Sequence, residues 1–132
     1  MFSSIEEAKK TLDDVTRPAL DREDAVHYLA KQDDPNILRR LVTALDDDVF
    51  GVRWAAAIAL AEMGKAAIPH VLSALTVNAG SSWMREGVYH VLHYNTSLAV
   101  REKSTELMAA LKGPAADMAS PAAAARLREA LA

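Results

Sequence analysis

Residues 52–64 read VRWAAAIALAEMG, and a similar stretch lies on either side of them in the chain. When Arg53 is aligned with Arg22 or Arg85, each arginine is followed by Ala or Val after three positions and by Leu after seven. The period between the arginines is about 31 residues. A constant period of roughly 20–50 residues is typical of a solenoid, because each unit buries its apolar face against its neighbours. The sequence therefore predicts stacked copies of one building block.

The composition is that of one globular domain. The chain has 132 residues, of which 51% are apolar and 25% charged. Aromatic residues make up 5% and alanine is abundant, which favours closely packed helices over sheets. The absence of cysteine from the sequence excludes disulfides, thiolate catalysis and cysteine-ligated zinc. The formal net charge of -3 argues against broad, non-specific binding of nucleic acid.

The sequence gives no sign of a membrane segment. The N-terminal residues are charged and contain no apolar signal core. No apolar run reaches the roughly 20 residues that are needed to span a bilayer. We therefore expect a cytoplasmic protein without a membrane partner.

Capping signals divide the chain into helices. Ser4 followed by Glu7 predicts the start of a first helix, and Asp34 before Pro35 predicts the start of a third. With no strand pattern in the sequence, the expected fold class is all-α: a short α-α superhelix of about three helix pairs with terminal capping helices. We expect a solenoid domain over 1–112, then a flexible linker over 113–120 and a C-terminal helix over 121–132. Within the solenoid domain we expect a capping helix over 1–17 and repeats over about 20–45, 46–76 and 81–111. The last repeat is expected to end in a single helix over about 97–111.

The middle repeat resembles a HEAT-like repeat of the phycobilisome-lyase type. The matching positions are the acidic turn at 46–48, Val52-Arg53 with the alanines that follow, Met63-Gly64, and the Ala-Ile-Pro run at 67–69. The outer repeats match in frame, but Asp21 and Met84 stand where the middle repeat has Val52. The resemblance implies a right-handed superhelix of antiparallel helix pairs, used mostly as a protein-binding scaffold. The family name comes from bilin-attachment proteins, although most members are not lyases.

Arg53 lies one residue inside the expected start of its helix and follows an acidic turn. We interpret it as a brace between successive repeats, paired with Asp47 or Asp48. The alternative is that Arg53 binds a phosphate or carboxylate of a partner. Because Arg22 and Arg85 occupy the same frame, the structural role is favoured.

Two histidines share one position of the repeat. His27 and His90 each follow a glutamate, Glu23 or Glu86, by four residues and lie on the same helical face as it. Such pairs resemble those of the dinuclear iron HEAT-repeat hydroxylases, but the His-Glu dipeptides of that family are missing. Helices two repeats apart also lie too far apart for two histidines to share a metal. A local site of Glu86, His90 and His93 is the alternative; we favour a solvated face, and expect no metal or cofactor.

The outer face of the arginine-led helices gives the sharpest functional hypothesis. At about 100° per residue, the core side of the fourth helix centres on Ala56 and Leu60, and Trp54 falls well away from it. An apolar centre with a polar rim, anchored by tryptophan, is typical of a binding patch. We predict that a partner or a second copy (a homodimer) binds there; the alternative is that the first or last helix covers Trp54. The predicted patch comprises Trp54, Ile58, Ala61, Trp83, His90 and His93.

A second candidate surface is the concave face, which the third, fifth and seventh helices are expected to line. Its mild positive bias suits an acidic peptide. It also suits a nucleic-acid backbone, as in HEAT-like DNA glycosylases, although the acidic net charge disfavours this alternative. The expected residues are Arg39, Arg40, Thr43, His70, Ser73, Arg101, Lys103 and Thr105. Residues 95–97, Asn-Thr-Ser, match a glycosylation acceptor but are interpreted as a turn and helix cap.

The sequence shows no catalytic pattern. It has no Gly-rich phosphate loop and no nucleophile and base at recognisable spacing, so we predict no catalytic residues and no enzyme. The predicted function is a non-enzymatic scaffold or adaptor for another protein or peptide. The alternative is an accessory factor, or a lyase-like protein, that acts on a chromophore-bearing or otherwise modified partner protein. The step from solenoid to scaffold is an analogy, since fold does not determine function.

Overall fold

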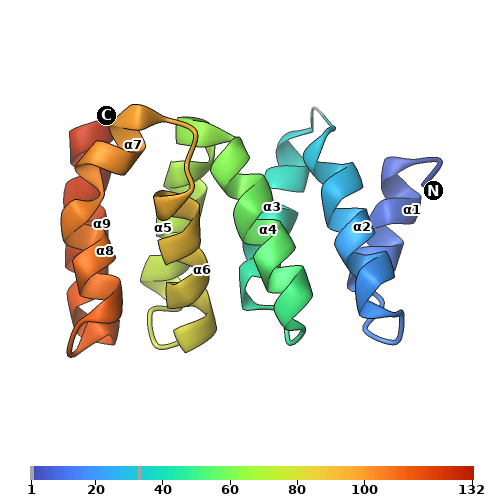
Figure 1. Cartoon of the computed structure of the whole chain (residues 1–132), viewed down its shortest axis with the longest axis horizontal. Helices are drawn as coiled ribbons and strands as arrows, with labels where there is room; N and C mark the ends of the chain where they lie inside the picture. The colour runs from blue at the N-terminus through green and yellow to red at the C-terminus, as the bar shows by residue number, and fades with distance from the viewer. Residues whose placement is uncertain (1, 33) are drawn as a thin grey trace.

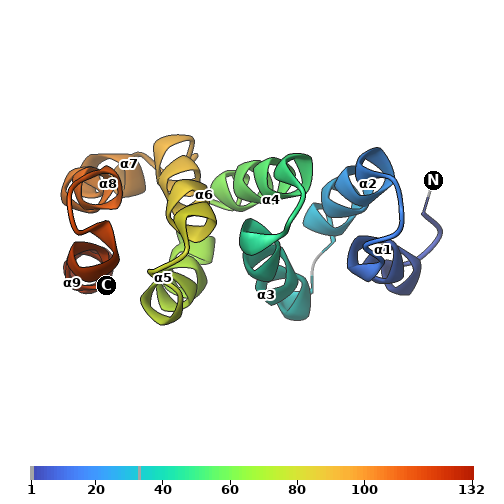
Figure 2. The same ribbon diagram turned by 90° about the horizontal axis from the view of Figure 1, so that it is seen from below.

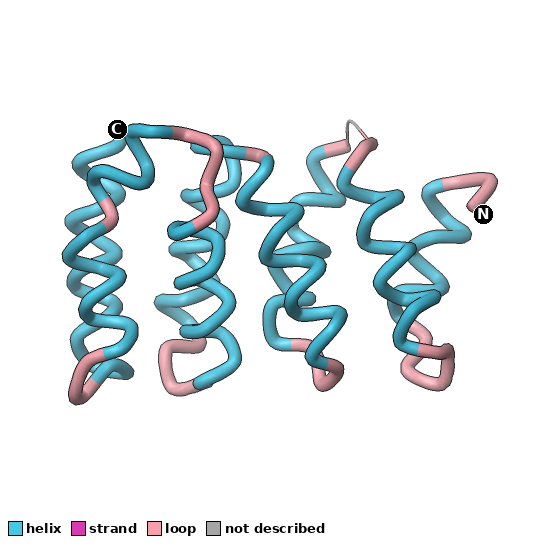
Figure 3. Tube along the Cα trace, viewed as in Figure 1, coloured by secondary structure: helices cyan, strands magenta, loops and turns pink. Residues whose placement is uncertain are grey.

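The computed structural model describes residues 2–32 and 34–132, and within these ranges the chain forms helices and turns without a strand. The all-α repeat fold is therefore confirmed, and Figure 3 shows its loops gathered at two opposite edges. None of the described helices is long and apolar enough to cross a membrane. The α-helices are α1 (Ile5–Asp13), α2 (Ala19–Ala30), α3 (Pro35–Thr43), α4 (Phe50–Glu62), α5 (Ile68–Val77), α6 (Ser82–His93), α7 (Leu98–Lys103), α8 (Thr105–Lys112) and α9 (Ala116–Leu131), with short 3-10 turns at Ala44–Asp46 and Gly64–Ala67.

The helices form two layers. One row, which we call the signature layer, contains α2, α4, α6 and the α7–α8 segment; the second layer contains α1, α3, α5 and α9 (Figure 2). Within the signature layer α2 packs on α4, α4 on α6, and α6 on α8. Leu29, Leu60 and Leu92, seven positions after the three arginines, are completely buried. The three segments are therefore copies of one unit, as the period predicts.

The helix pairs differ from the expected grouping. The sequence predicts pairs that begin at the second helix, with the first and last helices as caps. Instead α1 packs on α2, α3 on α4, α5 on α6, and α9 on both α8 and α5. Ala8 and Leu12 of α1 are completely buried, as are Ala25, Val26 and Leu29 of α2. The apolar stripe of α1 is thus half of the first pair, and α9 fills the last place of the second layer.

The last helix hairpin, which consists of the α7–α8 segment and α9, occupies the two layers in the reverse order. In Figure 1, α2, α4 and α6 run upward in the signature layer, whereas the α7–α8 segment runs downward in the same layer and α9 returns upward in the second layer. The expected single helix over 97–111 is also wrong, because it is interrupted between α7 and α8. Ser104 lies at the break, is completely buried, and donates its hydroxyl hydrogen to the carbonyl of Val100. A serine that bonds back to a preceding carbonyl commonly bends a helix.

Residues 113–120 do not form the expected linker. Three residues separate α8 from α9, which begins at Ala116, and Ala115 takes the left-handed conformation with φ 54°. Pro121 lies inside α9 and not at its start. Proline favours the first turn of a helix, and the sequence therefore predicts a start at Pro121. The helix begins earlier because Ala116 and Ser120, which precede Pro121, are buried against the rest of the chain. The C-terminal helix is therefore longer than predicted and packed along its length.

A polar network joins the repeats along the lower edge in Figure 1. Arg22 is 2% exposed and donates through Nε and Nη2 to the carbonyl of Leu12, at 2.9 and 2.7 Å. Its Nη1 and Nη2 donate to the carboxylate of Asp47, at 3.1 and 2.7 Å, and the amide of Val49 donates to the same carboxylate. Burial by itself raises the pKa of Asp47, but the hydrogen bonds from Arg22 and Val49 outweigh it, and the pKa lies below its ordinary value.

Asp46 extends this network to the next repeat. Its carboxylate accepts hydrogen bonds from Ser81 Oγ at 2.6 Å and from Asn78 Nδ2 at 2.9 Å, both in the turn before α6. The two neighbouring carboxylates therefore point to opposite sides: Asp47 binds the repeat before the turn and Asp46 the repeat after it.

The opposite edge is held by the turn after α6. Asn95 is 1% exposed and donates through Nδ2 to the carbonyl of Gly64 at 3.3 Å, and the amide of Thr96 donates to the carbonyl of Ala61 at 3.1 Å. Gly64 has φ 65°, a conformation that favours glycine. Ser97 caps α7 by accepting from the amide of Val100. Residues 95–97 thus form the predicted turn and cap, and the buried Asn95 amide is not exposed for glycosylation.

Asp47→Ala is expected to destabilise the chain by about 3 kcal/mol, because it leaves the buried guanidinium of Arg22 without its carboxylate. Asp48→Ala is the matched control, since the Asp48 side chain is exposed and its removal should change stability by less than about 0.5 kcal/mol. Urea denaturation followed by circular dichroism measures both free energies. Equal losses for the two variants would contradict the role assigned to Asp47.

Leu127→Ala is expected to cost about 2–4 kcal/mol of unfolding free energy, because Leu127 is 3% exposed and packs in the core with α9. Met118→Ala in the same helix is the control, since Met118 is 77% exposed. If the two variants unfold at the same urea concentration as the wild-type chain, α9 does not belong to the cooperative unit.

Candidate functional site

A continuous row of aromatic side chains covers the outer face of the signature layer over α4 and α6. We call it the aromatic strip. Four of its rings are half-exposed to well exposed: Phe50 at 61%, Trp54 at 38%, Trp83 at 41% and Tyr94 at 50%. The strip comprises Phe50 and Trp54 of α4, and Trp83, Tyr89, His90, His93 and Tyr94 of α6 and the residue after it.

The rings contact one another across the two helices. The Trp54 ring lies 4.8 Å from that of His90 and 5.9 Å from that of Tyr94, both at nearly right angles. His93 lies 4.7 Å from Tyr94 and stacks at 5.9 Å on Tyr89. Edge-to-face packing of this kind stabilises a ring pair by about 0.5–1.5 kcal/mol beyond its buried area. Because Trp54 is held by α6 and stays 38% exposed, neither α1 nor α9 covers it.

Two cations lie on the faces of these rings. The guanidinium of Arg53 is centred 4.2 Å from the Trp83 ring and 5.7 Å from the Phe50 ring. The ammonium of Lys112, from α8, lies 4.1 Å from the Tyr89 ring. Such contacts are worth about 0.5–1 kcal/mol at exposed sites, and they fix where the positive charges sit. The strip therefore presents apolar rings with positive charge held beside them.

His90 is a half-buried titratable group of the strip. Its Nδ1 is buried and has no hydrogen-bond partner among the described residues, and its Nε2 lies 4.0 Å from the carboxylate of Glu86. Burial lowers the pKa of His90 below its ordinary 6.5, and Lys112 and His93 lower it further, while the Glu86 carboxylate opposes the shift. The folded chain thus favours the neutral imidazole, which fits an apolar contact with Trp54.

The structure brings together four of the six residues of the predicted patch. Trp54, Trp83, His90 and His93 belong to the strip. Ala61 does not: it is 1% exposed, because the turn after α6 binds its carbonyl and covers it. Ile58 is half-buried and lines a separate hollow of about 330 Å³ between α2 and α4, with His27, Ala30, Lys31, Ala59, Glu62 and Met63.

Sequence reasoning missed three rings of the strip, Phe50, Tyr89 and Tyr94. Phe50 precedes Trp54 by four residues, and Tyr94 follows His90 by four, so helical spacing alone places each beside a predicted residue. Phe50 was missed because it is the first residue of α4. Tyr89 lies inside α6, and its place in the strip depends on the stacking of its ring on His93 and on its contact with Lys112 of α8.

Arg53 does not form the predicted ion pair with Asp47 or Asp48, and its hydrogen bonds stay within the turn before its own helix. Arg53 donates through Nη1 to the backbone carbonyls of Asp47 and Asp48, at 2.8 and 3.2 Å, and not to either carboxylate. Arg85 donates in the same way to the carbonyl six residues before it, that of Ala79. The Asp47 carboxylate is engaged by Arg22 instead, so the ion pair between repeats belongs to the preceding arginine.

The expected concave face is divided between the two layers. Arg39, Arg40, Thr43, His70 and Ser73 lie on α3 and α5 of the second layer, whereas Arg101 and Lys103 lie on α7 of the signature layer. Thr105, at the start of α8, is on the same side as α7. The inserted hairpin is the reason, since it places the seventh helix beside α6.

Several of these polar groups are also engaged within the chain. Arg40 Nε donates to Asp13 at 2.6 Å, and Ser73 Oγ accepts from Arg128 at 3.0 Å. Arg101 binds the carbonyl of Asn95, and Lys103 that of Ala130. Arg39 and His70 are exposed.

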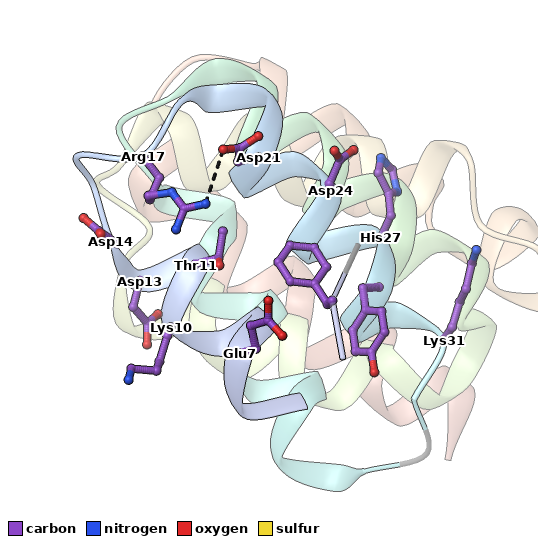
Figure 4. A pocket seen from close by; sticks show the side chains of 12 residues that line it. Glu7, Lys10, Thr11, Asp13, Asp14, Arg17, Asp21, Asp24, His27 and Lys31 are labelled. Atoms are coloured by element: carbon purple, nitrogen blue, oxygen red, sulfur yellow. Dashed lines mark hydrogen bonds and ion pairs between the residues drawn. The ribbon is translucent and has the colours of Figure 1, made fainter. Parts of the chain in front are cut away.

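A hollow of about 1200 Å³ lies between α1 and α2 at the N-terminal end of the stack (Figure 4). Its lining is mostly charged, and several of its acidic groups are hydrogen-bonded to near neighbours: Arg17 donates to Asp21, Thr16 to Asp14 and Ser3 to Glu7. Ser4 caps α1 as predicted, although Glu7 turns to Ser3 and not to Ser4. An open, polar and internally paired hollow is a poor candidate for a ligand site.

The alternative metal site finds no support in the geometry. The third residue of that site, His93, packs its ring on Tyr89 and Tyr94. Among the described residues no three His, Asp or Glu side chains are placed to hold one ion.

The family model for HEAT repeats matches residues 10–93, which is more than half of the chain. The match begins in α1 and ends with α6, so it stops where the regular alternation of layers stops. Comparisons with curated proteins and with solved structures gave no match. The finer resemblance to the phycobilisome-lyase type stays a prediction.

His90→Phe is expected to reduce the change in unfolding free energy between about pH 7.5 and about pH 5.5. Because the pKa of His90 is lowered in the folded chain, its contribution to stability is present above pH 6.5 and is lost as pH falls through the folded pKa. Urea denaturation at about pH 7.5 and about pH 5.5 measures the difference. His70→Phe, at an exposed histidine of α5 in the second layer, is the control and should leave the contribution of His90 in place. The assignment is wrong if the slope of His90→Phe equals that of the wild-type chain.

Proposed function

We propose that this chain, which belongs to the HEAT-repeat family, is a non-enzymatic interaction module that binds another protein through its aromatic strip. HEAT repeats generally mediate protein–protein interactions. The role of scaffold or adaptor and the position of the binding surface are our inferences from the geometry.

The observation that carries the proposal is that Trp54 and Trp83 are both partly exposed and line one groove between α4 and α6. Tryptophan, tyrosine and arginine are the residues most enriched at binding hot spots. Phe50, Arg53 and Tyr94 extend the surface on either side, and its rings are held by contacts with their neighbours before any partner arrives. Side chains that are already ordered lose little conformational entropy on binding.

The second layer offers a less suitable surface. Its polar groups are engaged with each other, as in the pairs Arg40–Asp13 and Arg128–Ser73. Its large exposed apolar side chains include Val77 and Met118, which lie on different helices, α5 and α9. An interface needs an apolar centre within a polar rim, and the strip supplies one.

Trp54→Ala is expected to weaken partner binding by at least about 30-fold, since truncation of a hot-spot tryptophan costs about 2 kcal/mol or more. The measurement is affinity capture from an extract of the source cells with wild-type and variant chains, followed by titration of the captured partner. Folding should survive, because Trp54 is already 38% exposed.

Met118→Ala is the control for this capture, because it removes an exposed apolar side chain from the second layer. Sedimentation of the purified chain separates binding of a second copy from binding of another protein. Capture of the same proteins at the same affinity by wild-type and Trp54→Ala chains would contradict the proposal, as would loss of cooperative unfolding in Trp54→Ala.

A further inference from the structure

The charges on the aromatic strip indicate the chemistry of the partner. Arg53 is held at one edge of its guanidinium by the carbonyls of Asp47 and Asp48, and the guanidinium lies over the Trp83 ring. Its Nε and Nη2 donate to no described residue, in contrast to Arg22, which uses all three nitrogens. A guanidinium that is fixed on one edge and unengaged on the other is prepared for a carboxylate.

Lys112 supplies a second fixed cation on the other side of α6. Its ammonium lies 4.1 Å from the Tyr89 ring, and the side chain is exposed. Arg53 lies over the Trp83 ring on the α4 side of α6, and Lys112 lies over the Tyr89 ring on the α8 side. A segment that crosses α6 from Trp54 to Tyr89 therefore meets both charges. A cationic segment would be repelled by them.

We propose that the partner presents an acidic amphipathic helix, whose carboxylates bind Arg53 and Lys112 while its apolar side chains cover Trp54 and Trp83. This rests on the proposed function and specifies its partner. Three neighbouring helices span roughly 16–20 Å from axis to axis, and a helix of about 15 residues, about 22 Å long, is enough to cross them.

One carboxylate beside the strip opposes this assignment and provides a further test of it. Glu86 lines the groove with Arg53, Trp54 and His90, and its carboxylate lies 4.0 Å from His90 Nε2. An acidic partner would be repelled by Glu86, so Glu86→Gln should tighten its binding by about two- to fivefold.

The experiment uses three synthetic helical peptides of about 15 residues that share one leucine stripe and carry glutamate, glutamine or lysine beside it. Trp54 and Trp83 are the two tryptophans of the chain, so their fluorescence reports binding to the strip directly. We expect the glutamate peptide to bind about three- to tenfold more tightly than the glutamine peptide, and the lysine peptide to bind most weakly. The glutamate preference should shrink as salt rises.

Charge reversal tests the named residues. Lys112→Glu should abolish the preference for glutamate over glutamine, and Arg53→Gln should reduce it. Lys65→Glu makes the same change of net charge at an exposed residue after α4 and should keep the preference. Because Lys112 makes no bond on which a turn depends, its variant keeps the test valid even if Arg53→Gln disturbs the fold.

The outcomes separate this inference from the proposed function. If the glutamine peptide binds as tightly as the glutamate peptide, and Trp54→Ala abolishes both, the strip is a docking surface without an acidic preference and the inference is wrong. Equal effects of Lys112→Glu and Lys65→Glu, or no binding of any peptide, overturn it as well. Displacement of the glutamate peptide by a single-stranded oligonucleotide would assign the cations to nucleic acid instead.

Discussion

Two neighbouring carboxylates hold the turn after α3 to the helices on both sides of it. Asp47 neutralises the buried guanidinium of Arg22, which also binds the end of α1, and Asp46 binds the turn before α6. A buried guanidinium without a carboxylate is an uncompensated charge, so the first repeat has to sit where Asp47 can reach it. Together with the hydrogen bonds from the turn before α6 to Asp46, this constraint keeps α2, α4 and α6 aligned. The outward side chains of α4 and α6 therefore meet, and the aromatic strip is a consequence of how the turns are joined.

Arg53 connects the stability of the stack with the chemistry of its surface. One nitrogen of its guanidinium binds the carbonyls of the acidic turn, and the same group lies over the Trp83 ring. Arg53 thus braces its own turn, and the binding of a partner's carboxylate through its other edge stays a proposal. A neutral His90 completes the arrangement, because a charged imidazole between Trp54 and Tyr89 would leave its buried Nδ1–H without an acceptor among the described residues.

The features that depend on the local sequence pattern were predictable. The features that depend on contacts between residues far apart in the sequence were not. The period of the arginines predicted the ridge of Leu29, Leu60 and Leu92, and helical geometry placed Trp54 outside. The burial of Ala61 depends on a turn about 35 residues later, which periodicity does not reveal. The acceptor predicted for Arg53 was wrong, because its long side chain reaches the backbone carbonyls of the turn as well as the carboxylates. Pro121 was interpreted as a helix start because local rules do not include the packing of α9 on α5.

The reversed insertion of the last hairpin has a consequence for folding kinetics. The earlier helices pack on the next or next-but-one helix of the chain, so these contacts are local in sequence and form early. The contact of α9 with α5 closes a longer loop, because α6, α7 and α8 lie between them in sequence. We expect α9 to dock last, after the neighbouring helices have formed the surface that receives it. The rate-limiting step of folding would then lie at the C-terminal end of the stack, at the far side from the pairing of Arg22 with Asp47.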